Sequence, residues 1–299
     1  MHAPWVMSTE RYPQPPFEPQ HIDKPGREGD MPTAPRWEAE RYRAAGKLEG
    51  KRCLVTGGDS GIGRSVAWLF AREGADVAIT YLPSERDDAT TIVERIRGLG
   101  RKALAIETDL REPDRAEAVV TGAVDALGGL DVLVNNAAYQ QHVEDIESLT
   151  FEQFQRTFET NIYSYFSVTK AALQHLSEGS SIINTGSITG LEGSAGLLDY
   201  SATKGAIHAF TKSLAQQLAG RGIRVNCVAP GPVWSPLNPA ERPYRGDMGY
   251  RSFGGDTPYG RPAQPEEIAP LYVYFASAAD SSYVTGEVVA LLGGETRAG

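Results

Sequence analysis

The fold of this 299-residue chain is decided by one stretch, Cys53-Leu54-Val55-Thr56-Gly57-Gly58-Asp59-Ser60-Gly61-Ile62-Gly63. An apolar run leads into a glycine turn, and apolar residues at helical spacing follow it at positions 66, 67, 69 and 70. A dinucleotide site requires a strand, a turn and a helix in this order, although the spacing departs from G-x-G-x-x-G. Glycines let the backbone adopt positive φ and approach a pyrophosphate, whose charge then sits on the free amides of a helix N-terminus. The alternative is an ordinary tight turn between strand and helix.

A second motif lies in Asp199-Tyr200-Ser201-Ala202-Thr203-Lys204-Gly205. A spacing of four places the phenol of Tyr200 and the ammonium of Lys204 on one helix face. A phenol titrates near ~10, and bringing its pKa to neutrality takes about 4 kcal/mol. One positive charge about 4 Å away supplies roughly that at an effective dielectric of about 20. The spacing also occurs in ordinary amphipathic helices, so it indicates catalysis only in combination with other motifs.

Together, the two motifs resemble those of the short-chain dehydrogenase/reductase family, T-G-x-x-x-G-x-G and Y-x-x-x-K, and the resemblance runs from about residue 50 to about residue 294. Asn135-Asn136-Ala137-Ala138 resembles the family's N-N-A-G, with Ala138 in place of the usual Gly. Pro230-Gly231-Pro232-Val233 resembles the segment that borders the nicotinamide, and Ser235 stands where a Thr is common.

The resemblance implies four catalytic residues. Tyr200 matches the general acid and base, and Lys204 matches the lysine that lowers the phenol pKa and holds the nicotinamide ribose. Ser187, thirteen residues before Tyr200, matches the serine that donates to the substrate oxygen. Asn161 matches the helix asparagine that anchors a proton-relay water. Alone, Ser187 would be an ordinary hydroxyl at a strand end and Asn161 an ordinary polar helix residue.

The expected cofactor is NAD(P), with NADP slightly favoured. The acid that would bind a ribose 2′-hydroxyl is expected about twenty residues after the glycine turn, and Tyr81 stands there instead. Ser84 and Arg86 follow closely enough to contact a 2′-phosphate, although Arg86 can equally be a solvated residue at a helix start. Ser60 stands where many NADP-specific relatives carry a basic residue, which weakens the case for NADP.

The resemblance also implies a set of cofactor-binding residues, in which Asp109 matches an acid at the adenine edge or is the N-cap of the next helix. The full set is Gly57, Asp59, Ser60, Gly61, Ile62, Gly63, Tyr81, Leu82, Ser84, Asp109, Leu110, Asn136, Ala137, Ala138, Tyr200, Lys204, Pro230, Gly231, Val233 and Ser235.

Apolar runs alternate with helical patterns from residue 51 onward. Strands are expected at 53–55, 77–81, 103–107, 132–134, 181–184, 224–228 and 288–291, and helices at 62–72, 84–99, 113–127, 151–176, 200–219 and 265–276. This alternation predicts an α/β fold, a single-domain, Rossmann-type, doubly wound parallel sheet of about seven strands with helices on both faces. The glycine turn, Asn135, Ser187 and Pro230 all follow strand ends, so they are expected to meet at one rim of the sheet.

Composition limits the other possibilities. A hydrophobic fraction of 41% at this length fits one substantial globular core. A net charge of −9 argues against nucleic-acid and anionic-membrane partners, which require a clustered basic face. Cys53 and Cys227 lie in separate apolar runs, so a disulfide is not expected, and no metal-site spacing occurs. No segment resembles a signal peptide or a membrane span, so a cytoplasmic protein is expected.

The first 47 residues differ in composition from the rest of the chain. Eight prolines occur in the first 35 residues, which predicts an extended arm over residues 1–47, followed by the catalytic domain over 48–299. The arm nevertheless carries the aromatic residues Trp5, Tyr12, Phe17, Trp37 and Tyr42. It is therefore either a disordered leader or a strap held by its aromatics on the domain or on a neighbouring subunit.

The substrate walls are expected to come from Tyr139, Gln140, Gln141 and His142, from residues 191–198, and from a mobile lid at about 235–262. Their mixture of aromatic and polar side chains favours a small aldehyde, ketone or polyol over a steroid or an acyl-carrier substrate. The arm, T-G-G-D-S-G-I-G-R and Tyr81-Leu82-Pro83 together resemble a bacterial subgroup of general aldehyde or alcohol oxidoreductases.

Two other functional classes stay open. A dinucleotide-binding redox sensor would keep the glycine turn but would not need Tyr200, Lys204, Ser187 and Asn161 together. A lyase or epimerase would share Tyr200 and Lys204, but it would not consume reduced cofactor with simple carbonyls. Relatives of this kind associate through the helices near 151–176 and 200–219, so a homotetramer is expected. The apolar residues behind that expectation are Phe166, Val168, Ala172, Ala206, Phe210 and Leu214.

Overall fold

Parallel strands form the centre of the computed structural model, which describes residues 12–18, 21–241 and 251–296. They are β1 (Arg52–Val55), β2 (Asp76–Tyr81), β3 (Ala103–Glu107), β4 (Val132–Asn135), β5 (Ser181–Thr185), β6 (Arg224–Pro230) and β7 (Val288–Leu291). Their order in the sheet is β3-β2-β1-β4-β5-β6-β7, and each neighbouring pair is parallel. The strand order reverses between β1 and β4, so the predicted doubly wound sheet is confirmed.

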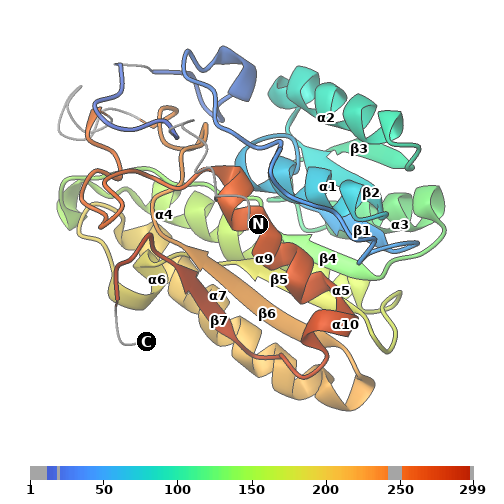
Figure 1. Cartoon of the computed structure of the whole chain (residues 1–299). Helices are drawn as coiled ribbons and strands as arrows, with labels where there is room; N and C mark the ends of the chain where they lie inside the picture. Colours follow the sequence, from blue (N-terminus) through green and yellow to red (C-terminus); the bar gives the residue numbers. More distant parts are fainter. Residues whose placement is uncertain (1–11, 19–20, 242–250, 297–299) are drawn as a thin grey trace.

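Two layers of helices cover the sheet (Figure 1). On one face pack α1 (Gly61–Arg72), α2 (Arg86–Gly98) and α9 (Pro265–Ala276), and on the other pack α3 (Arg115–Leu127), α5 (Ser164–Ala172) and α7 (Leu198–Leu218). Along β1, Cys53 and Val55 belong to the first core and Leu54 to the second. Because both faces of the sheet are covered, the strands are apolar at successive positions, which is why they were visible in the sequence.

One predicted helix, over residues 151–176, is not α-helical throughout. The observed α4 (Phe151–Phe158) continues into a π-helical turn, η4 (Glu159–Tyr163), before α5 begins. A π turn closes i→i+5 hydrogen bonds and therefore accommodates an extra residue within a helix. Asn161 lies in this turn and is fully buried. The backbone is thus helical without a break from Phe151 to Ala172, and it differs from the predicted helix by this π turn and by its earlier end.

Short elements complete the chain. They are η1 (Glu28–Asp30), η2 (Pro83–Glu85), η3 (Ile146–Ser148), α6 (Thr189–Glu192), η5 (Ala219–Arg221) and α10 (Ala278–Ser281). Cys53 and Cys227 are both buried free thiols. Within the three described ranges, no helix combines the length and the apolar character that a membrane crossing needs.

The described part of the arm packs on the domain. Phe17 stacks on Trp234, with ring centroids 4.2 Å apart, and both side chains are buried. Trp37 meets Trp68 of α1 edge-on, with centroids 6.0 Å apart. In Figure 1 the arm, in blue, runs beside the orange loops near α9 and then past α1. Trp5 lies outside the described residues.

The arm also delivers a buried carboxylate to the start of α1. Glu28 accepts a hydrogen bond from the Gly61 amide at 2.7 Å and pairs with Arg64 at 2.8 Å. Asp88 of α2 accepts the Glu28 amide at 2.7 Å and lies 3.2 Å from the Arg64 guanidinium. The first amides of a helix lack intrahelical partners, so an anion is stabilised there. This network joins the arm, the glycine turn and α2.

Candidate active site

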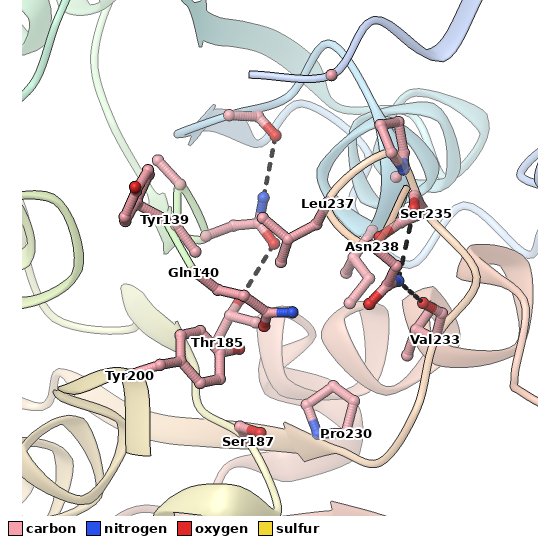
Figure 2. Close-up of a pocket in the computed structure, with 18 of the residues that line it drawn as sticks. Tyr139, Gln140, Thr185, Ser187, Tyr200, Pro230, Val233, Ser235, Leu237 and Asn238 are labelled. Carbon is pink, nitrogen blue, oxygen red and sulfur yellow. Dashed lines mark hydrogen bonds between the residues drawn. The ribbon is translucent and has the colours of Figure 1, made fainter. Parts of the chain in front are cut away.

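A cavity of about 1030 Å³ lies at the carboxyl ends of the central strands. Its walls include the glycine turn after β1, the loop after β4, Ser187 beyond β5 and Pro230 at the end of β6. Figure 2 shows Tyr139 and Gln140 on one side, Ser235, Leu237 and Asn238 on the other, and Ser187 and Pro230 below. Binding sites for small molecules typically measure about 300–1,000 Å³, so this cavity has room for a dinucleotide together with a small second molecule.

Most of the predicted cofactor-binding residues line this cavity. They are Gly57, Asp59, Ser60, Gly61, Ile62, Tyr81, Leu82, Asp109, Leu110, Asn136, Ala137, Ala138, Tyr200, Lys204, Pro230, Gly231, Val233 and Ser235. Gly63 and Ser84 are not among the lining residues.

The glycine turn fits a dinucleotide phosphate. Gly57 has a φ of +60°, which favours glycine, and a Cβ on Gly63 would lie 1.9 Å from the Gly57 carbonyl oxygen. The Asn136 side chain donates to that oxygen at 2.9 Å and holds the turn in place. Because the Gly61 amide already donates to Glu28, the next amide, that of Ile62, is the one that a phosphate would use.

Tyr200, Ser187 and Lys204 meet in the cavity. Tyr200 and Lys204 are one turn apart on α7, and the Ser187 side chain hydrogen-bonds to the Tyr200 hydroxyl. The Lys204 ammonium donates to the Thr185 carbonyl oxygen at 2.8 Å and lies 5.3 Å from the centroid of the Tyr200 ring. Tyr200 is 8% exposed and Lys204 is 1% exposed. The sheet and α7 thus bring together three side chains that are distant in the sequence.

Burial has the largest effect on the ionisation of this group. Burial raises the pKa of Tyr200 above its ordinary value; the hydrogen bond with Ser187 acts in the opposite direction, and the negative charge of Glu241 raises the pKa further. Burial lowers the pKa of Lys204 to about 8. Desolvation opposes the charged form of each group. The lowering of the phenol pKa by Lys204 stays a prediction. Tyr200 is a protonated phenol at neutral pH, which is the form that has a proton to donate.

Asn161 is held by protein groups. Its amide nitrogen donates to the Tyr139 carbonyl oxygen at 2.9 Å and to the Thr203 hydroxyl at 3.0 Å. Its amide oxygen accepts the Tyr139 amide at 2.7 Å. These bonds join the π turn to the loop after β4 and to α7. The contacts define a positioning role for Asn161, whereas its role in anchoring a water stays a prediction.

Two residues that were expected to favour NADP lie apart from the cavity. Ser84 is exposed, and the Arg86 side chain is 66% exposed and pairs with Glu107 at 2.5 Å. Neither Ser84 nor Arg86 is a lining residue, although Tyr81 is. The helix that starts after Pro83 directs these two positions outward. The expectation that Ser84 and Arg86 contact a 2′-phosphate is corrected accordingly.

Glu85, and not Ser84 or Arg86, lines the cavity beside Leu82. Its carboxylate accepts the Leu82 amide at 2.9 Å, as in a capping box. Burial raises the pKa of Glu85 to about 8, and the nearby charge of Asp59 contributes in the same direction. Burial also raises the pKa of Asp59, to about 6. Position 82 is Leu and not the Ser or Thr of a capping box, so no sequence motif indicated this contact of Glu85.

The arm supplies further wall residues that the sequence did not reveal. Lys24, Pro25 and Gly26 line the cavity. The Lys24 ammonium donates to the Gln140 carbonyl oxygen at 2.6 Å and lies 4.7 Å from the centroid of the Tyr139 ring. Burial lowers the pKa of Lys24 to about 8. Lys24 and Gln140 are 116 positions apart in the sequence, so no local pattern could have connected them.

The predicted substrate walls are partly present. Tyr139, Gln140 and His142 line the cavity, whereas Gln141 is not among the lining residues. The segment 191–198 contributes Glu192, Ser194 and Leu197. From the predicted lid, the lining residues are Ser235, Pro236, Leu237, Asn238, Ser252, Phe253, Gly254, Gly255, Asp256 and Thr257. Residues 242–250 of that segment lie outside the described residues.

Comparison with known proteins agrees with the fold. A family model described as "Enoyl-(Acyl carrier protein) reductase" matches residues 57–296. The chain belongs to the short-chain dehydrogenase/reductase family and is an oxidoreductase of that class.

Its relatives include proteins of similar length. It is 46% identical to "NADPH-dependent aldehyde reductase 1, chloroplastic" of Arabidopsis thaliana over 280 residues, which are 92% of this chain and 96% of the relative. It is 47% identical to "Glucose and ribitol dehydrogenase" of Daucus carota over 284 residues, 93% of this chain and 96% of the relative. A crystal structure of a short-chain dehydrogenase from Burkholderia cenocepacia J2315 in complex with NADP superimposes with a TM-score of 0.77 at 34% identity, covering 83% of this chain and 98% of the other.

Proposed function

We propose that this enzyme interconverts a small carbonyl compound and its alcohol, with NAD(P) as cofactor. The observation that carries the proposal is the meeting of Tyr200, Ser187 and Lys204 in the same cavity as the glycine turn. The cofactor, when bound, supplies or accepts the hydride. The amide of Ile62, the loop at Asn136 and the Lys204 ammonium are the groups that would hold it.

Each catalytic residue has a distinct task in this proposal. Tyr200 donates its phenolic proton to the carbonyl oxygen in reduction and takes a proton from the alcohol in oxidation. Ser187, through its hydroxyl, stabilises the charge that develops on the substrate oxygen. Lys204 provides positive charge behind Tyr200. Asn161 fixes the loop after β4 against α7 and so positions the cavity wall.

We further propose that NADP is used in preference to NAD. Two similar proteins are named or titled with NADPH or NADP. Glu85 stands at the wall beside Leu82, where the adenosine ribose is expected, and with a pKa of about 8 it is largely uncharged at neutral pH. An uncharged carboxyl does not repel a 2′-phosphate and can donate a hydrogen bond to it. This argument replaces the one from Ser84 and Arg86.

The substrate class in this proposal is a small aldehyde, ketone or polyol. Polar groups of Gln140, His142 and Ser187 share the cavity with apolar Leu197 and Leu237. One similar protein is named for an aldehyde reductase activity and another for glucose and ribitol. Such a mixed wall suits a short hydroxylated chain better than a steroid, which needs a largely apolar pocket.

We also propose a homotetramer, but the residues that support it differ from those that the sequence indicated. Three of the apolar residues behind that expectation are buried within the chain's own core, namely Val168, Ala172 and Leu214. Phe166 is 54% exposed, and two further aromatics of the same helical stretch, Phe151 and Tyr163, are exposed as well. These exposed aromatics are the surface through which we expect association. The cytoplasmic location and the boundary between arm and domain at residue 47 stay predictions from the sequence.

The test is a panel of carbonyl compounds assayed with NADH and with NADPH. We expect turnover of short aldehydes, and we expect Tyr200→Phe to reduce it by about 10²–10⁴-fold while cofactor binding persists, because only the proton donor is removed. Tyr283→Phe, which removes the phenol of a fully exposed tyrosine outside this cavity's lining residues, is the matched control and should retain full turnover. A Tyr200→Phe enzyme that keeps more than about a tenth of the turnover contradicts the assignment.

A further inference from the structure

The hydroxyl of Ser187 is held by Thr189, two residues further along the chain. The Thr189 amide donates to Ser187 Oγ at 3.2 Å, and the Thr189 hydroxyl donates to the same atom at 3.1 Å. The first bond forms a turn in which a serine hydroxyl accepts a backbone amide. A hydroxyl oxygen has two lone pairs, so these two bonds occupy the acceptor capacity of Ser187. What remains to Ser187 is its own proton.

This proton is directed at Tyr200. The Ser187 side chain hydrogen-bonds to the Tyr200 hydroxyl and acts to lower the pKa of that phenol, which is the effect of a donor. The hydroxyls therefore form a chain with one direction, in which Thr189 donates to Ser187 and Ser187 donates to Tyr200. Hydrogen bonds in such a chain strengthen one another. Because the phenol oxygen accepts from Ser187, the phenolic proton is left for a group in the cavity.

The backbone of the Thr189 turn packs on the helix that carries Tyr200. Thr189 begins α6, and the next amide, that of Gly190, donates to the Ser187 carbonyl oxygen at 3.0 Å. A Cβ on Gly190 would lie 2.6 Å from the carbonyl carbon of Lys204, so only a glycine lets the turn approach the backbone of α7 this closely. The end of β5, α6 and α7 thus hold the three hydroxyls in one arrangement.

We propose that Thr189 is a positioning residue for the reaction, because its hydroxyl keeps the Ser187 proton directed at Tyr200 and at the substrate oxygen beside it. The proposal rests on the carbonyl chemistry proposed above, in which Ser187 and Tyr200 act on the same oxygen. Without the Thr189 hydroxyl, one lone pair of Ser187 is released, and Ser187 can accept the phenolic proton instead of donating its own. Tyr200 then shares its proton with Ser187 and donates it less readily to the substrate.

The first test is Thr189→Val, which removes the hydroxyl and nearly keeps the shape of the side chain. We expect kcat to fall about tenfold, because one hydrogen bond of the chain is lost, while KM and cofactor affinity change little. Thr189→Ser keeps the hydroxyl and should restore most of the turnover. Thr121→Val, at an exposed threonine of α3 outside the cavity lining, is the matched control and should keep full turnover. Full turnover in Thr189→Val, or a loss that Thr189→Ser does not restore, would overturn the proposal.

The second test asks whether Thr189 acts through Ser187, since Thr189 itself lines the cavity. In a Ser187→Ala background, Thr189→Val should cause no further loss, because the hydroxyl that Thr189 orients is already absent. The loss from Thr189→Val alone should also be the same for every aldehyde in the panel. Losses that multiply in the double variant, or a loss that differs between aldehydes, would mean that Thr189 contacts the substrate directly, and the proposal is then wrong.

A spectroscopic test does not need turnover. The NMR shift of a tyrosine Cζ atom responds to hydrogen bonds at the phenol oxygen, and Tyr200→Phe identifies the Tyr200 resonance by its absence. We expect Thr189→Val to move this resonance and Thr189→Ser to leave it in place. A resonance that Thr189→Val does not move refutes the positioning role. If the resonance moves but no carbonyl compound is turned over, the proposed reaction is wrong while the positioning of the Tyr200 proton by Thr189 stands.

Discussion

The stacking of Phe17 on Trp234 predicts that Phe17→Ala lowers the free energy of unfolding of the protein. Phe17 is 4% exposed and Trp234 is fully buried. A buried phenylalanine removes about 150–250 Å² from water, which corresponds to about 4–6 kcal/mol at about 25 cal/mol per Å². That figure is an upper estimate because the unfolded chain already buries part of its apolar surface. The Trp234 indole also donates to the Thr33 carbonyl oxygen at 2.9 Å, a bond that survives the substitution.

We therefore expect Phe17→Ala to lower the free energy of unfolding by about 3 kcal/mol, within the range of buried Phe→Ala substitutions. Thermal melting should then shift downward by about 5 °C, since the entropy of unfolding scales with chain length. Deletion of residues 1–43 should lower Tm at least as much, because it also removes Glu28 from the start of α1. Tyr283→Ala, at a fully exposed aromatic, is the control and should change stability by less than about 0.5 kcal/mol. If Phe17→Ala melts at the wild-type temperature, the arm does not stabilise the domain and the reasoning fails.

Three further predictions follow from the site and the surface. Lys204→Met should reduce both turnover and cofactor affinity, and unchanged affinity in a cofactor titration would contradict the ribose contact. NADP affinity should fall as pH rises through about 8, because Glu85 becomes charged there, and NAD affinity should change less. Glu85→Gln should remove this difference in pH dependence between the two cofactors. Light scattering at micromolar concentration should report a tetramer that Phe166→Glu dissociates, since Phe166 is exposed on the proposed interface, and a wild-type monomer would refute that interface.

The sheet could be predicted because both of its faces are covered. Each of the seven strands appears in the sequence as an apolar run, and the observed ends agree with the predicted ones to within two residues. The cavity rim could be predicted for a related reason: parallel strands end at one edge, so motifs that follow strand ends must converge there. The glycine turn, Asn135, Ser187 and Pro230 were placed together by this argument, whereas Tyr200 and Lys204 were assigned from the family resemblance.

Other features of the structure could not be predicted, because no local sequence pattern indicates them. The π turn at Asn161 depends on how α4 and α5 fit against the loop after β4, and no residue in the stretch breaks a helical pattern. The positions of Ser84 and Arg86 depend on where the helical turn after Pro83 begins, and a shift of one residue there rotates a side chain by about 100°. The pKa of Tyr200 depends on burial, which a spacing of four residues does not reveal.

The contact of Thr33 with Trp234 joins positions 201 residues apart, and the contact of Arg36 with Gln264 spans 228. During synthesis the arm leaves the ribosome first, while the surface that receives it is among the last to be made. Contacts of such long sequence separation require a large loop to close, and they form late in folding. The nascent chain thus carries Phe17 without its partner Trp234 until β6 has been made. A folding defect beyond β6 would therefore first appear as an arm that fails to dock.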